Sequence, residues 1–466
     1  MSSKSVYDWA PSPHDPSYYT RRGWAFETLN DIANRQKHGQ TTMFFGANIS
    51  AQRPFGTDSL LEHDTEDNTL LTYCTASSAA DAQAWARRTL LFDGEYKTLD
   101  DLRKKIGGKV LPDVNGDETF LHLIVRSDTS FGVLLYTSHV TFDGAAVKIV
   151  TTRFLKKLAL LLDGGSPDLN LKWGDKYTNL TPAAGRVLGP NEVVEGAQHN
   201  ATLNSVMMDF ATAMPCAHNF RLRGSTGPGA TRYSGLSLSV SETTTLVQFA
   251  KSNGFTVNRV VHAALMMVCV FDNPPTANTP TDTTVVSLHV VNARYRLQPA
   301  YSGRDGFPGF AICTSPITVA LSTFQTPNKS EKDQLIEVAH VIKAEYLKQK
   351  TYPSLLAIAQ QQTEMLLPGF KNASPDRPPW MGPAYFGDGR GEDYLDRAYP
   401  GADGTTVLNL DEFFVSVNMT DPGGFFRAFS WRDRLILCVD YNERTVDHEV
   451  VQTWMDKWVE LLRVLL

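Results

Sequence analysis

The chain has 466 residues, about three times the length of a typical single domain, so two domains are expected. Apolar residues make up 42% and charged residues 20% of the sequence, which excludes intrinsic disorder for most of it. With 44 basic and 50 acidic residues, the net charge of −6 argues against nucleic acid and anionic membranes as partners.

No segment predicts insertion into a membrane. The longest apolar stretch, residues 260–271, is too short to cross a bilayer, and residues 1–19 lack the basic-then-apolar order of a secretory signal. We therefore expect an intracellular, cytoplasmic protein without a membrane partner. The five cysteines are scattered and form no Cys-x-x-Cys pair, which argues against a disulfide framework and a structural zinc site.

Periodicity in the first part of the chain predicts a mixture of helices and strands. A helix is expected near residues 22–38, and two strand-like runs, 119–126 and 131–140, form a hairpin around a polar turn. The second strand is expected to end at His139. A helix with an apolar stripe follows from Gly144 and stops at a Gly-Gly pair.

Glycines and prolines between residues 173 and 200 indicate a crossover between domains. We therefore place an N-terminal subdomain at residues 1–185, a linker at 186–200 and a C-terminal subdomain at 201–466. The elements expected in the C-terminal subdomain are a strand at 232–240, a helix capped by Ser241, a buried helix at 257–271, a strand at 283–297, helices at 331–349 and 352–366, irregular structure at 368–409, strands at 411–419 and 434–442, and a final helix from Asp447.

His139 and Asp143 are the leading catalytic candidates. They form a His-x-x-x-Asp pair, and about one such pair is expected by chance in a chain of this composition. The sequence holds two. The other, His63 and Asp67, lies in an acidic stretch with no strand before it, and we interpret it as a solvated loop. Only the first pair is followed by a glycine, Gly144, and lies between an apolar strand and an amphipathic helix.

A histidine in a tight loop at the end of a strand can present its imidazole as a general base near neutral pH. The alternative for His139 is a core histidine that hydrogen-bonds to the backbone. Asp143 has a structural role in this interpretation, because the four-residue spacing does not require it to contact the imidazole. It is expected to turn back into the protein and hold the loop in shape.

Residues 138–144, SHVTFDG, preceded by a strand, resemble the HxxxDG signature of the chloramphenicol acetyltransferase-like superfamily. This superfamily includes nonribosomal-peptide condensation domains and the fungal trichothecene O-acetyltransferases, and the nearest resemblance is to the latter group. Weaker similarities follow in the family's order at residues 172–182, 256–265, 290–299 and 434–447.

This resemblance implies an α/β fold in which two chloramphenicol acetyltransferase-like subdomains, each of mixed sheet plus helices, meet in a V with a central tunnel. It implies that His139 deprotonates an acceptor hydroxyl, which attacks an acyl thioester without a covalent acyl-enzyme. The expected reaction moves an acyl group from a coenzyme A thioester to a hydroxyl of a secondary metabolite, and the expected acyl group is acetyl. We expect a monomer with no bound cofactor and no metal.

Two departures from related groups weaken a peptide-bond-forming role and a plant-type acyltransferase role. Condensation domains usually carry a second histidine just before the catalytic one, where this chain has Ser138, and the DFGWG loop of plant acyltransferases is not found. One alternative is a condensation-like enzyme that cyclises or dehydrates a polyketide or peptide-derived intermediate. An acyl carrier protein is an alternative source of the donor. A non-catalytic binding module is the third hypothesis, and the intact HxxxDG argues against it.

Three further residues receive roles from the resemblance. The strand predicted at 283–297 places Arg294 and Arg296 on one face at its end, and relatives hold the aspartate of HxxxDG with an arginine from the second half. We therefore predict an ion pair between Arg294 and Asp143 that links the halves and fixes the loop aiming His139. Ser416 and Asn418 are candidate oxyanion donors or substrate-binding residues; the alternative is that they are ordinary polar positions of a half-exposed strand.

Overall fold

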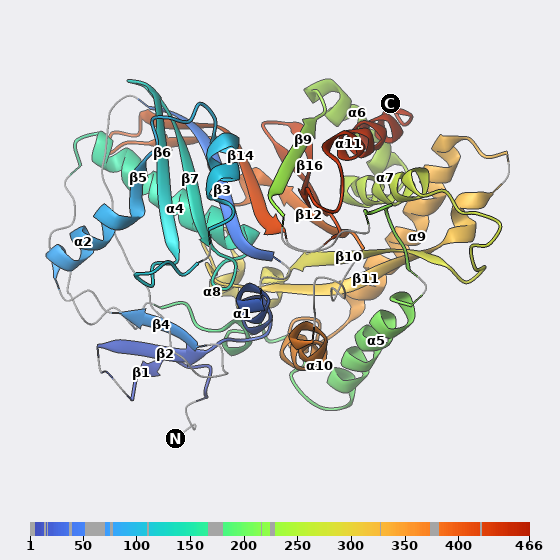
Figure 1. Ribbon diagram of the computed structural model, residues 1–466, viewed down its shortest axis with the longest axis horizontal. Coiled ribbons are helices and arrows are strands. Elements are labelled where there is room, and N and C mark those ends of the chain that lie inside the picture. The colour runs from blue at the N-terminus through green and yellow to red at the C-terminus, as the bar shows by residue number, and fades with distance from the viewer. Residues whose placement is uncertain are drawn as a thin grey trace. The chain divides into compact units, whose positions relative to one another are not determined.

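The computed structural model describes residues 5–466 except 14, 16, 37–39, 52–69, 75–77, 110, 166–179, 216, 224–228, 327, 373–381 and 420–421. His63, Asp67 and most of segment 172–182 therefore lie outside the described residues. The chain forms two compact units, each built from three segments (Figure 1). The first consists of Met1–Gly189, Arg294–Ala311 and Glu392–Asn418, and the second of Pro190–Ala293, Ile312–Gly391 and Met419–Leu466.

The predicted contiguous subdomains differ from these units. Arg294–Ala311 and Glu392–Asn418 were both placed in the C-terminal subdomain, 201–466, but they pack in the first unit. The difference has a physical cause: a compact unit is defined by which segments bury each other, and residues far apart in the chain can do so.

A six-stranded sheet forms the centre of the first unit, in the order β13-β14-β3-β7-β6-β5. The predicted hairpin is confirmed, because β6 and β7 are antiparallel neighbours. β3 lies antiparallel on the other side of β7, with Thr42 opposite Ser138. The strands of this unit, including a small sheet of β1, β2 and β4, are β1 (Ala10–Pro11), β2 (Tyr18–Arg22), β3 (Gln40–Ala51), β4 (Leu70–Cys74), β5 (Leu90–Phe92), β6 (Thr119–Ser127), β7 (Ser130–Ser138), β13 (Ala398–Pro400) and β14 (Thr406–Met419).

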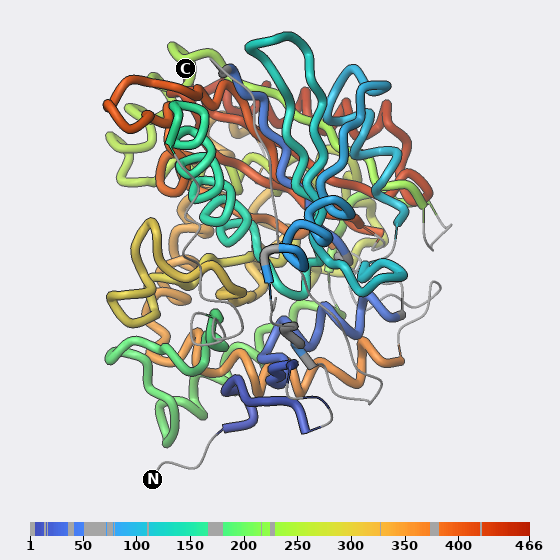
Figure 2. Tube along the Cα trace, turned by 90° about the vertical axis from the view of Figure 1, so that its left-hand side faces the viewer, coloured from blue at the N-terminus to red at the C-terminus, as the bar shows by residue number. Residues whose placement is uncertain are grey.

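Helices α3 and α4 cover opposite faces of this sheet, as Figures 1 and 2 both show. α3 packs in a core cluster with Phe44 and Tyr136, whereas α4 brings Lys148 to 5.8 Å from the ring of Phe413, which stacks on Phe45. Neighbouring strand residues point to opposite faces, so Phe44 and Phe45 mark the two faces. The helices of the unit are α1 (Phe26–Gln36), α2 (Ala79–Thr89), α3 (Leu99–Ile106), α4 (Gly144–Leu162) and α8 (Pro299–Ser302), with 3-10 turns at Ala184–Arg186, Arg294–Arg296 and Gly391–Asp393.

The second unit is built on a sheet in the order β11-β10-β12-β15-β16-β9, with β8 also paired to β10. A core cluster joins one face of this sheet to the helices Val240–Ser252, Val257–Asp272, Glu331–Thr351 and His448–Arg463. Trp454 and Trp458 of the last helix are among its most buried members. The elements of this unit are β8 (Ala217–His218), β9 (Thr231–Ser237), β10 (Thr284–Asn292), β11 (Ile312–Ala320), β12 (Ala384–Arg390), β15 (Phe425–Trp431), β16 (Arg434–Asn442), α5 (Ala197–Ala213), α6 (Val240–Ser252), α7 (Val257–Asp272), α9 (Glu331–Thr351), α10 (Ala359–Lys371), α11 (His448–Arg463) and a 3-10 turn at Leu321–Gln325.

Several predicted elements need correction. The segment 368–409, expected to be irregular, contains β12, β13 and the start of β14; the glycines of β12 suggest a loop, but the strand is held by parallel pairing to β10 and β15. Helix α5 and strand β15 were not predicted. The cap of α6 is Ser239 rather than Ser241, because Ser239 and Glu242 form a capping box.

The strand predicted over 283–297 ends at Asn292, and Arg294 and Arg296 lie in a 3-10 turn. The prediction that they share a strand face is therefore wrong. Arg294 is buried, whereas Arg296 is half-buried and its guanidinium lies over the ring of Tyr295.

Among the described residues, no single helix has the length and apolar composition needed to cross a membrane; only the pair α6 and α7, bent by 100°, meets both measures together.

Candidate active site

His139 lies directly after β7, in the tight loop that connects this strand to α4. β7 is almost entirely buried, so the strand delivers His139 to a fixed point at the end of the sheet. The Oγ of Ser138 accepts the N–H of Val140 at 3.2 Å, which helps turn the chain out of the strand. The His139 side chain lies largely inside the protein, since only 6% of the residue is exposed.

A hydrogen bond fixes the tautomer of the imidazole. Nδ1 of His139 lies 2.8 Å from the carbonyl oxygen of Phe142 in the same loop. A carbonyl oxygen only accepts hydrogen bonds, so Nδ1 carries the proton and donates it. In the neutral ring, Nε2 then carries the lone pair, which is the state that a general base requires.

Phe310 packs against the same imidazole. Its ring centroid is 5.5 Å from that of His139, at an interplanar angle of 42°. Phe310 belongs to the segment Arg294–Ala311, which lies in the first unit although it follows β10 of the second unit in sequence. The residues that hold this segment therefore influence the position of the histidine.

Asp143 caps the helix that follows the loop. It adopts an extended backbone conformation, and its Oδ1 accepts the N–H groups of Ala145 at 3.1 Å and Ala146 at 2.8 Å. Aspartate is a favourable N-cap because its carboxylate satisfies backbone donors that have no partner within the helix and is stabilised by the helix dipole. Gly144 is the first residue of α4.

The predicted ion pair between Asp143 and Arg294 is present. Nη1 of Arg294 lies 2.9 Å from Oδ2 of Asp143, and Nη2 lies 2.8 Å from Oδ1, so the contact is bidentate. The N–H of Ala311 donates to Oδ2 at 2.9 Å, and Nε of Arg294 donates to the carbonyl of Phe307 at 2.9 Å. Both partners are buried and both belong to the first unit, so the pair was wrongly expected to link two separate halves.

Burial on its own would raise the pKa of Asp143, because it removes the charged carboxylate from water. The Arg294 guanidinium and the N–H donors of Ala311 and Ala146 outweigh that effect and hold the pKa below its usual value. Asp143 therefore remains ionised, and its charge fastens the loop to α4 at one end and to the segment Arg294–Ala311 at the other.

Ser416 and Asn418 lie on β14, two positions from β7 in the sheet. Phe414, two residues before Ser416, packs on the Phe44 face, so strand alternation places the side chains of Ser416 and Asn418 on that face too. The α4 face, into which the loop of His139 leads, is the opposite one. Ser416 is fully buried, whereas Asn418 is half-buried next to the end of the strand.

Sequence reasoning did not find three groups that contact His139: the carbonyl of Phe142, the ring of Phe310 and the amide of Asn30. Any residue has a carbonyl, and the other two contacts join distant parts of the chain, so no local pattern signals them. Among the described residues, no group of three or more His, Cys, Asp or Glu side chains could hold a metal ion.

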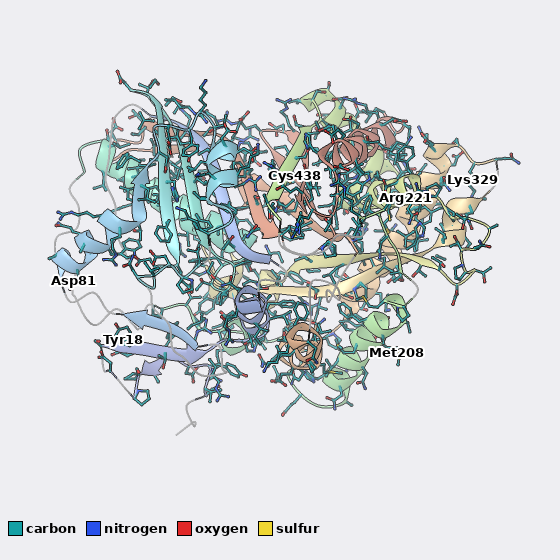
Figure 3. All side chains as sticks on the ribbon, viewed as in Figure 1. Tyr18, Asp81, Met208, Arg221, Lys329 and Cys438 are labelled. Carbon is teal, nitrogen blue, oxygen red and sulfur yellow. The ribbon has the colours of Figure 1, made fainter. Side chains whose placement is uncertain are left out.

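Cys269 and Cys438, which the sequence indicates are packing residues, are buried free thiols of the second unit. Figure 3 labels Cys438. Burial raises the pKa of both thiols, so both remain protonated. Neither is suited to act as a nucleophile.

A family model of the 15-O-acetyltransferase Tri3 matches residues 108–361, more than half of the chain, including His139, Asp143 and Arg294. The chain belongs to this family. The predicted class of enzyme, one that transfers acyl groups, is thereby confirmed, as is the resemblance to the fungal trichothecene O-acetyltransferases.

Individual relatives are distant but match along most of their length. The trichothecene 15-O-acetyltransferase TRI3 of Fusarium sporotrichioides is 23% identical over 437 residues, covering 86% of this chain and 80% of the relative. The trichothecene O-acetyltransferase TRI3 of Trichoderma arundinaceum is 21% identical over 506 residues, covering 96% and 94%.

Solved structures confirm the predicted fold class. The structure of TRI3 from Fusarium sporotrichioides matches with a TM-score of 0.83 at 18% identity, covering 99% of this chain and 98% of that one. The first condensation domain of the CDA synthetase matches with a TM-score of 0.62 at 14% identity, covering 94% of each chain. At these identities the matches establish the fold and leave the reaction to the family and the site.

Proposed function

We propose that this enzyme transfers an acetyl group from acetyl-coenzyme A to a hydroxyl of a secondary metabolite, with His139 as the general base. The observation that carries the proposal is the hydrogen bond from Nδ1 of His139 to the carbonyl of Phe142, which assigns the lone pair to Nε2. A base needs that lone pair, and the bidentate pair of Asp143 with Arg294 supports the loop that carries it.

The proposed steps use one proton and no covalent acyl-enzyme. Nε2 of His139 removes the proton of the acceptor hydroxyl while the oxygen attacks the carbonyl carbon of the thioester. The tetrahedral intermediate then collapses, the carbon–sulfur bond breaks, and the imidazolium returns the proton to the leaving thiolate. The products are an acetate ester and free coenzyme A.

The Phe142 carbonyl also favours the imidazolium that forms during the reaction. The ring gains a positive charge at the transition state, and the partial negative charge of an oxygen 2.8 Å from Nδ1 stabilises it. Asp143 does not take this role, because its two oxygens are engaged by Arg294 and by backbone N–H groups. We assign it to holding the loop.

The acceptor is the open part of the proposal. Two relatives are named for O-acetylation of trichothecenes, one of them at the 15-hydroxyl, so a trichothecene with a free 15-hydroxyl is the first acceptor to test. We propose free acetyl-coenzyme A as the donor. The competing hypothesis is a carrier-bound acetyl thioester, which predicts no transfer from free acetyl-coenzyme A.

The test incubates the purified protein with acetyl-coenzyme A and this alcohol, and measures thiol release with a thiol reagent and the ester by mass spectrometry. Acetyl transfer predicts equal amounts of free coenzyme A and acetylated product. Thiol release without ester indicates hydrolysis and overturns the proposal for that acceptor. A product lighter by one water and no thiol release would support the cyclase or dehydratase alternative instead.

A further inference from the structure

Helix α1 contacts the catalytic loop through a side chain that the mechanism above does not use. Nδ2 of Asn30 donates to the main-chain carbonyl oxygen of His139 at 2.8 Å, although 109 residues separate the two in sequence. We propose that Asn30 is a positioning residue for acyl transfer, which holds the main chain at His139 so that the imidazole keeps its direction. This inference rests on the proposed role of His139 as the base.

The position of His139 explains why such a support is useful. The pairing between β3 and β7 ends with Thr42 opposite Ser138. His139 is therefore the first residue after β7 that is not paired to β3. Backbone carbonyls inside a protein need hydrogen-bond donors. The amide of Asn30 supplies one from outside the sheet, at the residue whose side chain must be aimed.

α1 also reaches the imidazole side of His139. Phe26 lies one helical turn before Asn30, on the same face of α1, and stacks on Phe310 at 6.2 Å and 18°. Phe310 in turn contacts the imidazole at 5.5 Å. One face of α1 therefore holds the main chain of His139 directly and its ring through Phe310.

The start of α1 is itself firmly held, which makes it a suitable support. Arg21 forms a bidentate ion pair with Glu27, with both distances at 2.8 Å, and both side chains are buried. Glu27 also accepts the N–H of Trp24 at 2.7 Å. A buried bidentate pair with a further hydrogen bond fixes the first turn of the helix in position.

Asn34 provides a matched control on the next turn of the same helix. Its Nδ2 donates to the carbonyl of Leu111, also at 2.8 Å, and it is half-buried like Asn30. The two asparagines share residue type, helix face, burial and kind of partner. They differ in which carbonyl they hold, so a purely structural role predicts similar effects of replacing either.

The experiment compares Asn30→Ala with Asn34→Ala in the acetyl-coenzyme A assay and by thermal melting. We expect Asn30→Ala to lower kcat roughly 10- to 100-fold, the cost of misplacing a catalytic group by about 1 Å, with KM for acetyl-coenzyme A changed less than about threefold. Asn34→Ala should lower the melting temperature by about as much as Asn30→Ala does, but leave kcat within about twofold of the unmodified enzyme. Losses of kcat that are equal in the two variants overturn the inference.

A second pair of variants gives a readout that lost stability does not produce. Asn30→Asp preserves size, but a carboxylate cannot donate to a carbonyl, and its negative charge next to His139 favours the imidazolium. The acidic limb of the kcat/KM profile should therefore move to higher pH in Asn30→Asp, and less in Asn34→Asp, which is one turn further away. An unmoved limb in Asn30→Asp contradicts the inference.

The histidine itself can be followed even if the enzyme proves inactive on the chosen acceptor. In protein labelled with 13C at histidine, NMR titration reports the pKa of each ring, and His139→Asn identifies the signal of His139. A larger shift of that signal in Asn30→Asp than in Asn34→Asp supports the positioning role. No shift in either overturns it, whereas absent acetyl transfer by the unmodified enzyme counts against the proposed function alone.

Discussion

His139 has both a chemical and a packing role, and two substitutions separate them. His139→Asn retains a side-chain N–H that can reach the carbonyl of Phe142, but it has no second ring nitrogen to accept a proton. His139→Ala loses both groups and the contact with Phe310. We expect both variants to lower turnover by roughly 10²- to 10⁴-fold, because this is the usual contribution of a general base.

The two variants should differ in stability. His139→Ala leaves a space beside Phe310 in a largely buried position and should melt at a lower temperature than His139→Asn. Retention of more than about a tenth of the turnover by His139→Asn would mean that the imidazole is not the base. The loop would then act by holding substrate rather than by moving a proton.

The oxyanion donor is a separate question at the residue scale. Both side chains lie on the sheet face opposite to the α4 face, into which the loop of His139 leads. Ser416 is also fully buried, so Asn418, half-buried next to the end of β14, is the one of the two to test as a donor. If its amide stabilises the tetrahedral intermediate, Asn418→Ala should lower kcat by about 10²- to 10³-fold. Ser416→Ala should change kcat little and lower stability instead, and the reverse pattern would exchange the two assignments.

At the scale of one element, the N-terminus of α4 is held by both a cap and a buried ion pair. Asp143→Ala removes the cap and leaves the Arg294 guanidinium uncompensated, which should lower the free energy of unfolding by about 3–5 kcal/mol. Ser239→Ala is the matched control, because it removes the cap of α6 without a buried ion pair and should cost about 1 kcal/mol. Urea denaturation of the two variants measures the difference.

An equal effect in the two variants would show that the ion pair adds nothing to stability beyond the cap.

The ion pair of Asp143 with Arg294 also predicts that stability depends on pH. The pKa of Asp143 is lowered in the folded state, so its stabilisation is complete above the unfolded pKa of about 3.9 and is lost as pH falls through the lower folded value. Asp143→Asn should weaken this acid sensitivity, and an unchanged acid limb would assign it to other carboxylates.

Local pattern predicted the elements whose burial follows a regular period. The hairpin of β6 and β7, the helices α4 and α7, and β16 agree closely with the predicted segments. α5 was missed because its buried residues, His199, Thr202, Val206 and Ala213, mix polar with apolar types and form no apolar stripe. β12 was missed because two of its seven residues are glycines, which favour a loop over a strand. It is a strand because β10 and β15 pair with it on either side, and its own sequence does not indicate that pairing.

The candidate site divides in the same way. His139 and Asp143 were identified because HxxxDG places them in one short segment. Arg294 was identified through resemblance to a family, and its turn geometry was predicted incorrectly. Asn30 was not identified from the sequence, because its contact with His139 depends on how α1 packs beside the end of β7. No short segment of the sequence indicates that packing.

At the scale of the whole molecule, each unit is assembled from three segments, so its stability depends on contacts between distant parts of the chain. The core of the second unit contains a cluster of buried polar rings. His262 of α7 lies 2.9 Å from the hydroxyl of Tyr346, and His289 of β10 lies 2.8 Å from Oε1 of Gln349; both partners belong to α9. The rings of His289 and Tyr346 stack at 4.2 Å.

These two histidines predict that mild acid destabilises the second unit. Burial lowers the pKa of both, well below the usual value for His262 and to about 4 for His289. Between pH 6.5 and 4 the unfolded chain therefore binds more protons than the folded one, so stability is complete above about pH 6.5 and falls as pH decreases to 4. For His289 alone, the loss across this window is roughly 3 kcal/mol, from a shift of 6.5 to about 4.

Hydrogen exchange at several pH values tests this prediction by region. Amides of α7, α9 and β10 should lose protection between pH 6.5 and 4, because these elements surround the two rings. His289→Gln removes one titrating group and should weaken the pH dependence of protection, although it also lowers stability at pH 7. The control is His340→Gln, at an exposed position of α9, which should leave this pH dependence unchanged. A buried histidine that stays neutral in the folded state makes stability depend on pH, and replacing it removes that contribution. If His289→Gln retained the full pH dependence, the acid sensitivity would therefore have to come from other groups.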